Sequence, residues 1–165
     1  GSTGLADGQG VEKWDPGMEA AGCVDETNSA IGVVLAEADV PREMRASLVR
    51  IQHELFEIGA ELSLPGYSKT AAAHVAQLEH DLDVLNSGLP PLKEVVLPGR
   101  NRPAGGCPLA RTICRRAERA AWAAAQRSTV NPQALRYLNR LSDLLFVMAR
   151  SLARQNGGAE VLWQH

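Results

Sequence analysis

Three arginines stand four residues apart in the second half of the chain, a spacing that places them on one face of a helix. Arg111, Arg115 and Arg119 would rise one turn at a time along that face, with Glu118 beside them. Stacked guanidinium groups repel one another, so some anion should compensate them, either a polyphosphate or a carboxylate from another helix. The alternative is a basic face in contact with solvent, which is the common fate of a run of charges. The spacing alone leaves both interpretations open.

The distribution of charge along the chain supports an anionic partner for these arginines. The formal net charge is −2, yet nearly all of the 19 acids lie in the first 99 residues, and every basic residue after that point is an arginine. Arginine suits bidentate contacts with phosphate or carboxylate. A basic pair of helices that docks on acidic residues, in the same chain or in another subunit, would explain the same asymmetry.

Three weaker groups accompany the arginines. Asn139 and Asp143 share a helix face among leucines, where they could border a site or form a hydrogen-bonded clasp between helices. Asp25 could face the arginines and lock an interface through an ion pair, or belong to an acidic surface patch. Near the start of the chain, the amides of Thr3-Gly4 and a lysine, Lys13, could cradle a phosphate, although this motif is short and is not a Walker sequence.

The elements that must position these residues are predicted to be helices. Apolar residues recur at intervals of three and four, and the breaks between them contain proline, glycine and asparagine. The predicted helices cover residues 18–39, 41–62, 70–86, 103–127 and 132–155. Leu64, Pro65 and Gly66 end the second helix, and Pro108, which fits only a first turn, favours a late start of the fourth. Residues 87–102 are predicted to form a long functional loop.

The fold class that follows is all-α: an antiparallel bundle of about five helices with short links and no strand long enough to build a sheet. The 165 residues suit a single domain, with an extended segment at 1–16, the bundle at 17–155 and a tail at 156–165. The three cysteines have no disulfide or metal spacing and favour a reducing compartment, the cytoplasm. The apolar runs are too short to cross a membrane, and the scattered histidines offer no metal site.

Taken together, six motifs resemble, in order and over nearly the whole chain, the PduO-type ATP:cob(I)alamin adenosyltransferase family. Two of them, the runs from Arg115 to Arg119 and from Asn139 to Asp143, are highly specific as a pair. All six are Thr3-Gly4-Leu5, Val24-Asp25-Glu26-x-Asn28-Ser29-Ala30-Ile31-Gly32, Ile51-Gln52-x-Glu54-Leu55-Phe56-x-Ile58-Gly59, Leu97-Pro98-Gly99, Ala110-Arg111-x-x-Cys114-Arg115-Arg116-Ala117-Glu118-Arg119 and Asn139-Arg140-Leu141-Ser142-Asp143-x-Leu145-Phe146.

The resemblance implies a homotrimer of five-helix bundles with active sites at the subunit interfaces. It implies transfer of the 5′-deoxyadenosyl group from ATP to cob(I)alamin, with Mg²⁺ and with a cobalamin reductase as a further partner. Asp25 and Arg111 would form a salt bridge between subunits that orders the site, Arg115 would act in catalysis, and Leu97 would border the corrinoid. The residues implied to line the ATP site are Thr3, Gly4, Lys13, Arg115, Arg116, Glu118, Arg119 and Asn139.

The chain departs from the family pattern at positions near the implied site. Val95 stands where phenylalanine is common, and Arg100 stands where a second glycine is usual. A weakened relative that binds ATP or corrinoid without efficient turnover is therefore the second hypothesis. A helical structural or nucleic-acid-binding protein is the third, and the negative net charge and the 4% aromatic content argue against it. Neither a nucleic acid nor a membrane is an expected partner.

Overall fold

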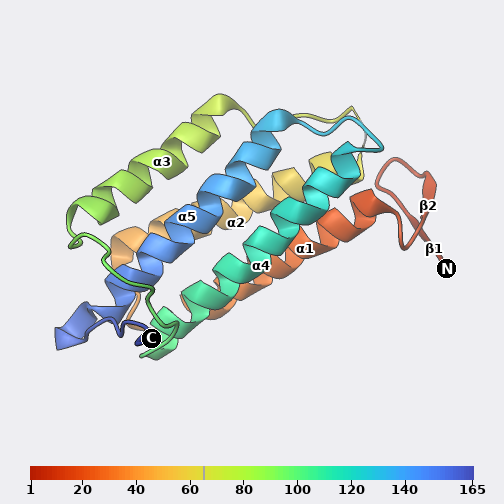
Figure 1. Ribbon diagram of the computed structural model, residues 1–165. Coiled ribbons are helices and arrows are strands. Elements are labelled where there is room, and N and C mark those ends of the chain that lie inside the picture. Colours follow the sequence, from red (N-terminus) through yellow and green to blue (C-terminus); the bar gives the residue numbers. More distant parts are fainter. Residues whose placement is uncertain (65) are drawn as a thin grey trace.

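The computed structural model describes residues 1–64 and 66–165, and these ranges contain a bundle of five α-helices (Figure 1). They are α1 (Pro16–Leu35), α2 (Arg42–Ser63), α3 (Ala72–Ser87), α4 (Arg102–Ala125) and α5 (Pro132–Ala153), followed by the short 3₁₀ helix η1 (Gln155–Gly157). The prediction of five helices is confirmed, with bounds that differ by a few residues. The expected break after α2 includes Pro65, which lies outside the described residues.

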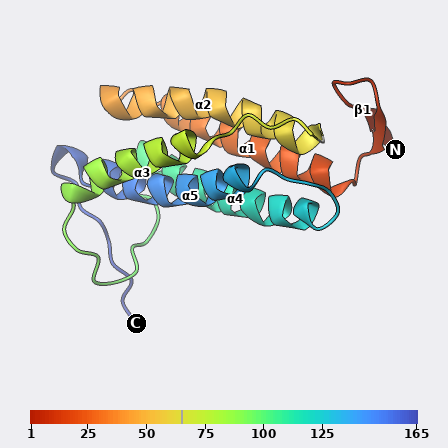
Figure 2. The same cartoon turned by 90° about the horizontal axis from the view of Figure 1, so that it is seen from above.

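The helices pack in the order α2, α1, α4, α5, α3, so α4 lies between α1 and α5 (Figures 1 and 2). Consecutive helices alternate in direction, as expected for an antiparallel bundle. The neighbours α3 and α5 are the exception, since they are two steps apart in sequence and run in the same direction. This order places the predicted site residues of α4 and α5 on adjacent helices.

Proline and a capping side chain start three of these helices. Asp15 caps α1 by accepting a hydrogen bond from the Gly17 N–H, and Pro16 follows it at the first helical position. Asn131 caps α5 by accepting a hydrogen bond from the Gln133 N–H, and Pro132 follows it. The side-chain amide of Asn131 also donates to the buried carboxylate of Glu61 at 2.7 Å. That contact ties the start of α5 to the end of α2.

The core is aliphatic, as the low aromatic content predicts. Leucine, isoleucine and valine fill it from α1, α2 and α5, whereas α4 buries mainly alanine and cysteine. These small residues allow α4 to lie close to its neighbours. At Gly106 the two helices approach closely, because a Cβ atom there would lie 2.8 Å from Val34 Cγ2 on α1.

Two local details differ from what the pattern of the sequence indicates. Within the extended segment 1–16, β1 (Ser2–Gly4) and β2 (Gly10–Glu12) form an antiparallel hairpin with Thr3 opposite Val11. Only three residues of each strand pair, which is too short for a pattern of alternating hydrophobicity. Helix α4 also does not start late: it runs through Pro108, and burial of Pro103, Ala104 and Cys107 in this turn offsets the backbone hydrogen bond that proline lacks.

The segment between α3 and α4 is a long loop, as predicted, and it pairs with the tail segment 156–165 through an antiparallel bridge between Val96 and Leu162. Gly99 and Arg100 both have positive φ angles in this loop, 103° and 111°. Glycine adopts such angles readily, and an L-residue with a side chain does so only under strain. The backbone at Arg100 is therefore strained, and a glycine there would be relaxed.

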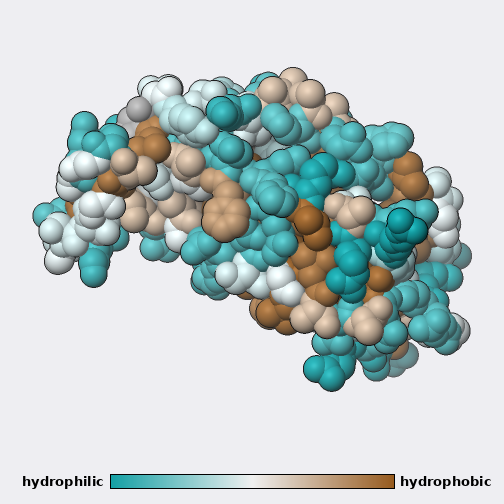
Figure 3. All heavy atoms as spheres, turned by 180° about the vertical axis from the view of Figure 1, so that it is seen from behind, coloured by the Kyte–Doolittle hydropathy of each residue, from teal (hydrophilic) through white to brown (hydrophobic). Residues whose placement is uncertain are grey.

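The surface behind α4 and α5 is mostly polar, with apolar patches between the polar side chains (Figure 3). Large apolar side chains that are exposed on the helices include Val33, Phe56, Leu109 and Trp122. Among the described residues, no helix is long and apolar enough to cross a bilayer.

Candidate active site

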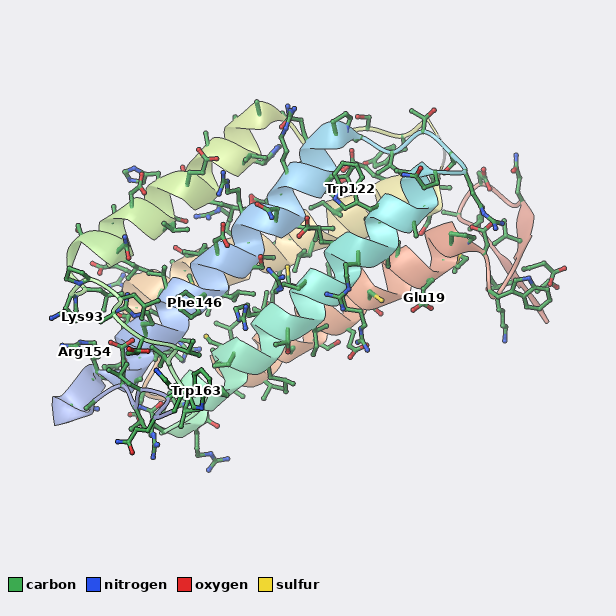
Figure 4. The ribbon with its side chains drawn as sticks, in the orientation of Figure 1. Glu19, Lys93, Trp122, Phe146, Arg154 and Trp163 are labelled. Carbon is green, nitrogen blue, oxygen red and sulfur yellow. The ribbon has the colours of Figure 1, made fainter. Side chains whose placement is uncertain are left out.

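The three stacked arginines do lie along one side of α4, but their surroundings differ. Arg115 and Arg119 are exposed to solvent near the middle of the helix. Arg111 is half-buried, and its guanidinium carbon lies 5.7 Å from the ring centroid of Phe146, which α5 presents toward α4 (Figure 4). This is a cation–π contact. The stack therefore has one anchored member and two whose guanidinium groups are open to a ligand.

Arg116 points to a different neighbour. Its guanidinium lies 2.5 Å from the carboxylate of Glu26 on α1, and about half of each side chain is exposed. This hydrogen bond raises the pKa of Arg116, so the arginine is charged at every relevant pH. Within one chain, the acidic segment of α1 thus meets the basic helix through Glu26. A phosphate that bound Arg116 would have to share it with Glu26.

Glu118 and Asn139, both predicted to line the nucleotide site, do meet. The Asn139 amide donates to Glu118 Oε1 at 3.5 Å, a long hydrogen bond between α5 and α4. Both side chains line a cavity of about 410 Å³ between α3, α4 and α5, which we call the Glu118 cavity. A carboxylate and an amide at a cavity wall can bind hydroxyl or amino groups of a ligand. The pair is thus a clasp between helices that also faces a cavity.

The same cavity contains residues that the sequence did not single out. Trp122 is 52% exposed and forms part of its wall, and Arg136 contributes a further cation. Arg140 lies at its edge, paired with Glu79 of α3 and with Asp143 at 3.1 Å each. These residues come from three helices. The place of Trp122 on the arginine-rich helix, one turn after Glu118, was the signal that could have identified it.

A second cavity, of about 350 Å³, lies between the loop 88–101, the start of α4 and the end of α5. We call it the loop cavity. Val96, Leu97, Pro98 and Gly99 form one wall, and Arg111 is one of its few charged residues. Leu97 therefore borders a largely apolar cavity, as the prediction for the corrinoid required. Val95, the residue in place of phenylalanine, is 60% exposed on the same loop.

The hairpin residues lie apart from the arginines within one chain. Thr3 sits in the paired part of β1, and Lys13 is exposed just after β2, with its backbone N–H bonded to the Gly1 carbonyl at 3.1 Å. The hairpin extends beyond the end of the bundle, next to the start of α1 (Figure 2). Thr3, Gly4 and Lys13 are thus not brought to Arg115 and Arg119 by the fold of a single chain.

Asp25 and Arg111 are also separate within the chain. Asp25 is exposed on α1, and Arg111 lines the loop cavity of the same chain. Among the described residues, the salt bridges that the structure contains do not join them. An ion pair between these two residues would therefore require two copies of the chain.

The buried thiols do not belong to this chemistry. Burial raises the pKa of Cys107 to about 12 and raises the pKa of Cys114 further, so both stay protonated and inert. Within residues 1–64 and 66–165, no group of three or more His, Cys, Asp or Glu side chains is placed to hold a metal ion. The groups near α4 and α5 that can bind a ligand include guanidinium groups, carboxylates such as that of Glu118, the Asn139 amide and the apolar wall of the loop cavity.

Comparison with known proteins identifies close relatives over the whole chain. Residues 1–152 match the sequence profile of the family described as cobalamin adenosyltransferase. A cobalamin adenosyltransferase from Cupriavidus metallidurans is 51% identical over 164 residues, which are 99% of this chain and 89% of the relative. A corrinoid adenosyltransferase from Mycobacterium leprae is 41% identical over 99% of this chain and 91% of the relative.

Solved structures agree with the sequence comparison. A variant of the PduO-type ATP:corrinoid adenosyltransferase from Lactobacillus reuteri, in complex with cobalamin and ATP, superposes with a TM-score of 0.93 at 30% identity, over 100% of this chain and 95% of that chain. A second variant of the same enzyme, in complex with ATP, also gives a TM-score of 0.93 at 30% identity, over 99% of this chain and 95% of that chain.

Proposed function

Because the chain belongs to the cobalamin adenosyltransferase family, we propose that it transfers the 5′-deoxyadenosyl group of ATP to the cobalt of cob(I)alamin. The products would be adenosylcobalamin and triphosphate. The observation that carries the proposal is the agreement of two independent features. Relatives with this activity in their names match nearly every residue, and the arginines of α4 face solvent beside a cavity that contains Glu118 and Asn139.

The reaction suits the residue types present. The cobalt(I) electron pair of the corrinoid forms a bond to C5′ of ATP, the C5′–O bond breaks, and the triphosphate leaves with the electron pair of the broken C5′–O bond. No proton has to be removed from a nucleophile, so no general base is required. The protein has to align cobalt with C5′ and stabilise the charge that gathers on the leaving group.

We assign the triphosphate to the arginines of α4. Arg115 and Arg119 are exposed and one turn apart, and guanidinium groups bind phosphate oxygens in pairs. Arg116 would join them by sharing its contact with Glu26. We assign Glu118 and Asn139 to the nucleoside, since a carboxylate and an amide can bind its hydroxyl and amino groups. Mg²⁺ would be held mainly by the triphosphate, as is usual for this ion.

We assign the corrinoid to the loop cavity. Its wall is mostly apolar, and it lies at the end of α4 that begins with Arg102, within reach of Arg111. Arg111 would then stand between the two substrates, on the same helix face as Arg115. The assignment follows the rule that a ligand with a large apolar surface binds in a concave apolar site with few polar groups.

A trimer with shared active sites completes the proposal. The hairpin with Thr3, Gly4 and Lys13 lies away from Arg115 within one chain, and Asp25 is exposed while Arg111 lines the loop cavity. A neighbouring copy could supply the hairpin to the arginines and Asp25 to Arg111. Exposed apolar side chains such as Val33 and Leu109 would be covered in such an assembly. We place the enzyme in the cytoplasm, where a cobalamin reductase would supply the Co(I) form.

The test is direct. Purified protein is incubated without oxygen with chemically reduced cobalamin and MgATP, and the formation of the cobalt–carbon bond is followed by absorbance while triphosphate is measured separately. Equal amounts of adenosylcobalamin and triphosphate are expected. Tight binding of both substrates without product would instead favour a binding module that has lost turnover, for which Val95 would be the first position to restore to phenylalanine.

A further inference from the structure

A buried ion pair links the end of α5 to the tail segment 156–165. The side chains of Arg150 and Glu160 are each 6% exposed. Arg150 Nε donates to Glu160 Oε1 at 2.5 Å, and Nη2 donates to Oε2 at 3.3 Å. Arg154 Nη1 adds a bond to Glu160 Oε2 at 3.1 Å. A buried pair of charges stabilises a protein only when its geometry and its hydrogen bonds are nearly complete, and this one is bidentate.

The same guanidinium also holds the start of the loop. Arg150 Nη2 donates to the backbone carbonyl of Pro90 at 2.9 Å. The Arg150 side chain thus connects α5, to which it belongs, with two other segments. It binds the tail through Glu160 and the loop before α4 through Pro90. Arginine is suited to this because its donors point in several fixed directions in one plane.

The tail is paired with the loop a few residues further on. The Leu97 N–H donates to the Val161 carbonyl at 2.8 Å, and the Trp163 N–H donates to the Val95 carbonyl at 2.7 Å. The Trp163 ring is half exposed and lies near the loop and the start of α4 (Figure 4). A two-stranded pair this short is not stable by itself in water. It therefore depends on contacts outside the pair, and the buried ion pair of Glu160 lies directly before it in the chain.

The segment held in this way is one wall of the loop cavity. Leu97 is both bonded to the tail and part of the cavity wall, and its neighbours Val96, Pro98 and Gly99 complete that wall. Glu160 is not among the residues that line the cavity. Arg150 does line the cavity, so Glu160 can affect a ligand there only by orienting the Arg150 side chain and by holding the loop.

We propose that Arg150 and Glu160 are positioning residues for the corrinoid: they fasten the tail to the loop and so hold the wall of the loop cavity in place. The inference rests on the proposed function, because it takes this cavity as the corrinoid site. Neither residue is assigned a contact with cobalt or with ATP. Their role is to keep Leu97 and its neighbours where an apolar substrate face can pack on them.

The first test measures the loop without any substrate. In hydrogen–deuterium exchange, the amides of Leu97 and Trp163 should be protected in the wild type and should exchange about tenfold faster in Glu160→Gln, which removes the charge and keeps the shape. The matched control is Asp81→Asn, which breaks a half-buried ion pair between α2 and α3 that involves no residue of the loop or the tail. It should leave both amides protected. Equal protection in the wild type and Glu160→Gln would overturn the proposal.

The second test separates the two substrates. Glu160→Gln should raise KM for cob(I)alamin about tenfold and leave KM for ATP unchanged, while Arg150→Lys, which keeps the charge but loses the bidentate contact, should give a smaller rise. Asp81→Asn should leave both KM values unchanged. A parallel rise of both KM values in Glu160→Gln would indicate general destabilisation and overturn the positioning role, as would an unchanged KM for the corrinoid.

Two proline variants keep the test independent of the buried charge. Trp163→Pro removes the N–H that donates to Val95, whereas Leu162→Pro removes no bond of this ladder, since the ladder uses the N–H groups of Leu97 and Trp163. Only Trp163→Pro should raise KM for the corrinoid. Were the wild type to form no adenosylcobalamin, the proposed function would fail, and the positioning role would still be decided by amide exchange and by the affinity for cob(II)alamin.

Discussion

At the scale of single residues, the proposed nucleotide site depends on the guanidinium groups of α4, which we assign to the leaving triphosphate. Arg115 is the central member of the row, exposed and one turn from both Arg111 and Arg119. Arg111 is held by Phe146 and Arg116 by Glu26. Arg115 is therefore free to change its contacts between bound ATP and the transition state. A group stabilises charge that develops during the reaction when its contact with the leaving group is stronger in the transition state than in bound ATP.

Replacement of Arg115 by glutamine should lower kcat/KM for ATP by about 100-fold to 1,000-fold, the usual effect of removing one donor to a developing anion. Arg115→Lys should lose less, because the charge stays and only the paired contact is lost. The assay is the formation of adenosylcobalamin with saturating corrinoid. Arg42→Gln, a change at an exposed arginine at the start of α2, is the control and should not alter the rate. Similar rates for Arg115→Gln and Arg42→Gln would remove the α4 arginines from the mechanism.

The pKa of Glu160 predicts how the free energy of unfolding should depend on pH. Burial by itself raises the pKa of Glu160, but the hydrogen bonds and charges of Arg150 and Arg154 outweigh it, so the pKa in the folded protein lies below the usual value. The folded protein then binds fewer protons than the unfolded chain, and acid favours unfolding. The stabilisation by Glu160 is fully present above the unfolded pKa of about 4.3 and is lost as the pH falls through the folded value.

The measurement is the free energy of unfolding in urea for the wild type and Glu160→Gln over a range from about pH 3 to 7. The wild type should be the more stable at neutral pH, and the difference should shrink as Glu160 is protonated below roughly pH 4. The same measurement on Asp81→Asn is the control, because it gives the pH dependence of the free energy of unfolding when a different ion pair, Arg50–Asp81, is removed. A difference between wild type and Glu160→Gln that stays constant down to the lowest pH would contradict the assignment.

At the scale of elements, the close approach of α4 to α1 sets the position of the arginines. Gly106 has no room for a side chain, since a Cβ atom there would lie 2.8 Å from Val34 Cγ2, whereas a Cβ atom at Gly105 would lie no closer than 4.0 Å to its nearest neighbour, the Gly99 Cα. Alanine is favoured over glycine in a helix by about 1 kcal/mol. The two adjacent positions therefore respond in opposite ways to the same change.

We expect Gly105→Ala to raise the free energy of unfolding by up to about 1 kcal/mol, and Gly106→Ala to lower it by about 1–3 kcal/mol because the helices must move apart. Thermal and urea denaturation of both variants provide the measurement. Each variant is the control of the other, since they share the helix, the substitution and the gain in helix propensity. Stabilisation by both changes would mean that α4 and α1 are packed less closely than described.

The helices could be predicted because their pattern is local. The leucine stripe of α5 and its Asn131-Pro132 start follow from a few consecutive residues, whereas the Asp15-Pro16 start of α1 lies two residues before the predicted one. The row of Arg111, Arg115 and Arg119 follows from the same periodicity. The contacts of the site could not be predicted in this way. The pair of Arg116 with Glu26 and the place of Trp122 in the Glu118 cavity depend on which helices become neighbours, and no repeat in the sequence encodes that choice.

The pairing of the tail with the loop was missed for a different reason. Arg150 and Glu160 are only ten residues apart, but a turn lies between them, and the loop that they hold is sixty residues earlier. Neither segment has a strand pattern, because only Val96 and Leu162 form a bridge. The burial of both charges, which is visible only in three dimensions, is what distinguishes this pair from the exposed ion pairs elsewhere.

At the scale of the whole molecule, one chain contains the arginines and both cavities, while the hairpin with Thr3, Gly4 and Lys13 projects from the end of the bundle (Figure 2). In a closed ring of three copies, each head-to-tail interface brings one surface of a chain against a different surface of the next. The hairpin of one copy could then reach the arginines of its neighbour. The proposed trimer would thus bring together groups that lie apart within one chain.

This hypothesis predicts that two inactive variants restore each other. Lys13→Ala lacks one half of the proposed nucleotide site and Arg115→Gln lacks the other, so each should be nearly inactive alone. When the two are unfolded together and refolded as mixed trimers, about one quarter of the shared sites should receive both intact halves by chance. The recovered rate of adenosylcobalamin formation measures that fraction, and the two variants refolded separately and then mixed are the control. If each chain formed its own complete site, mixed trimers would be no more active than that control, and the hairpin would have to serve the chain that carries it.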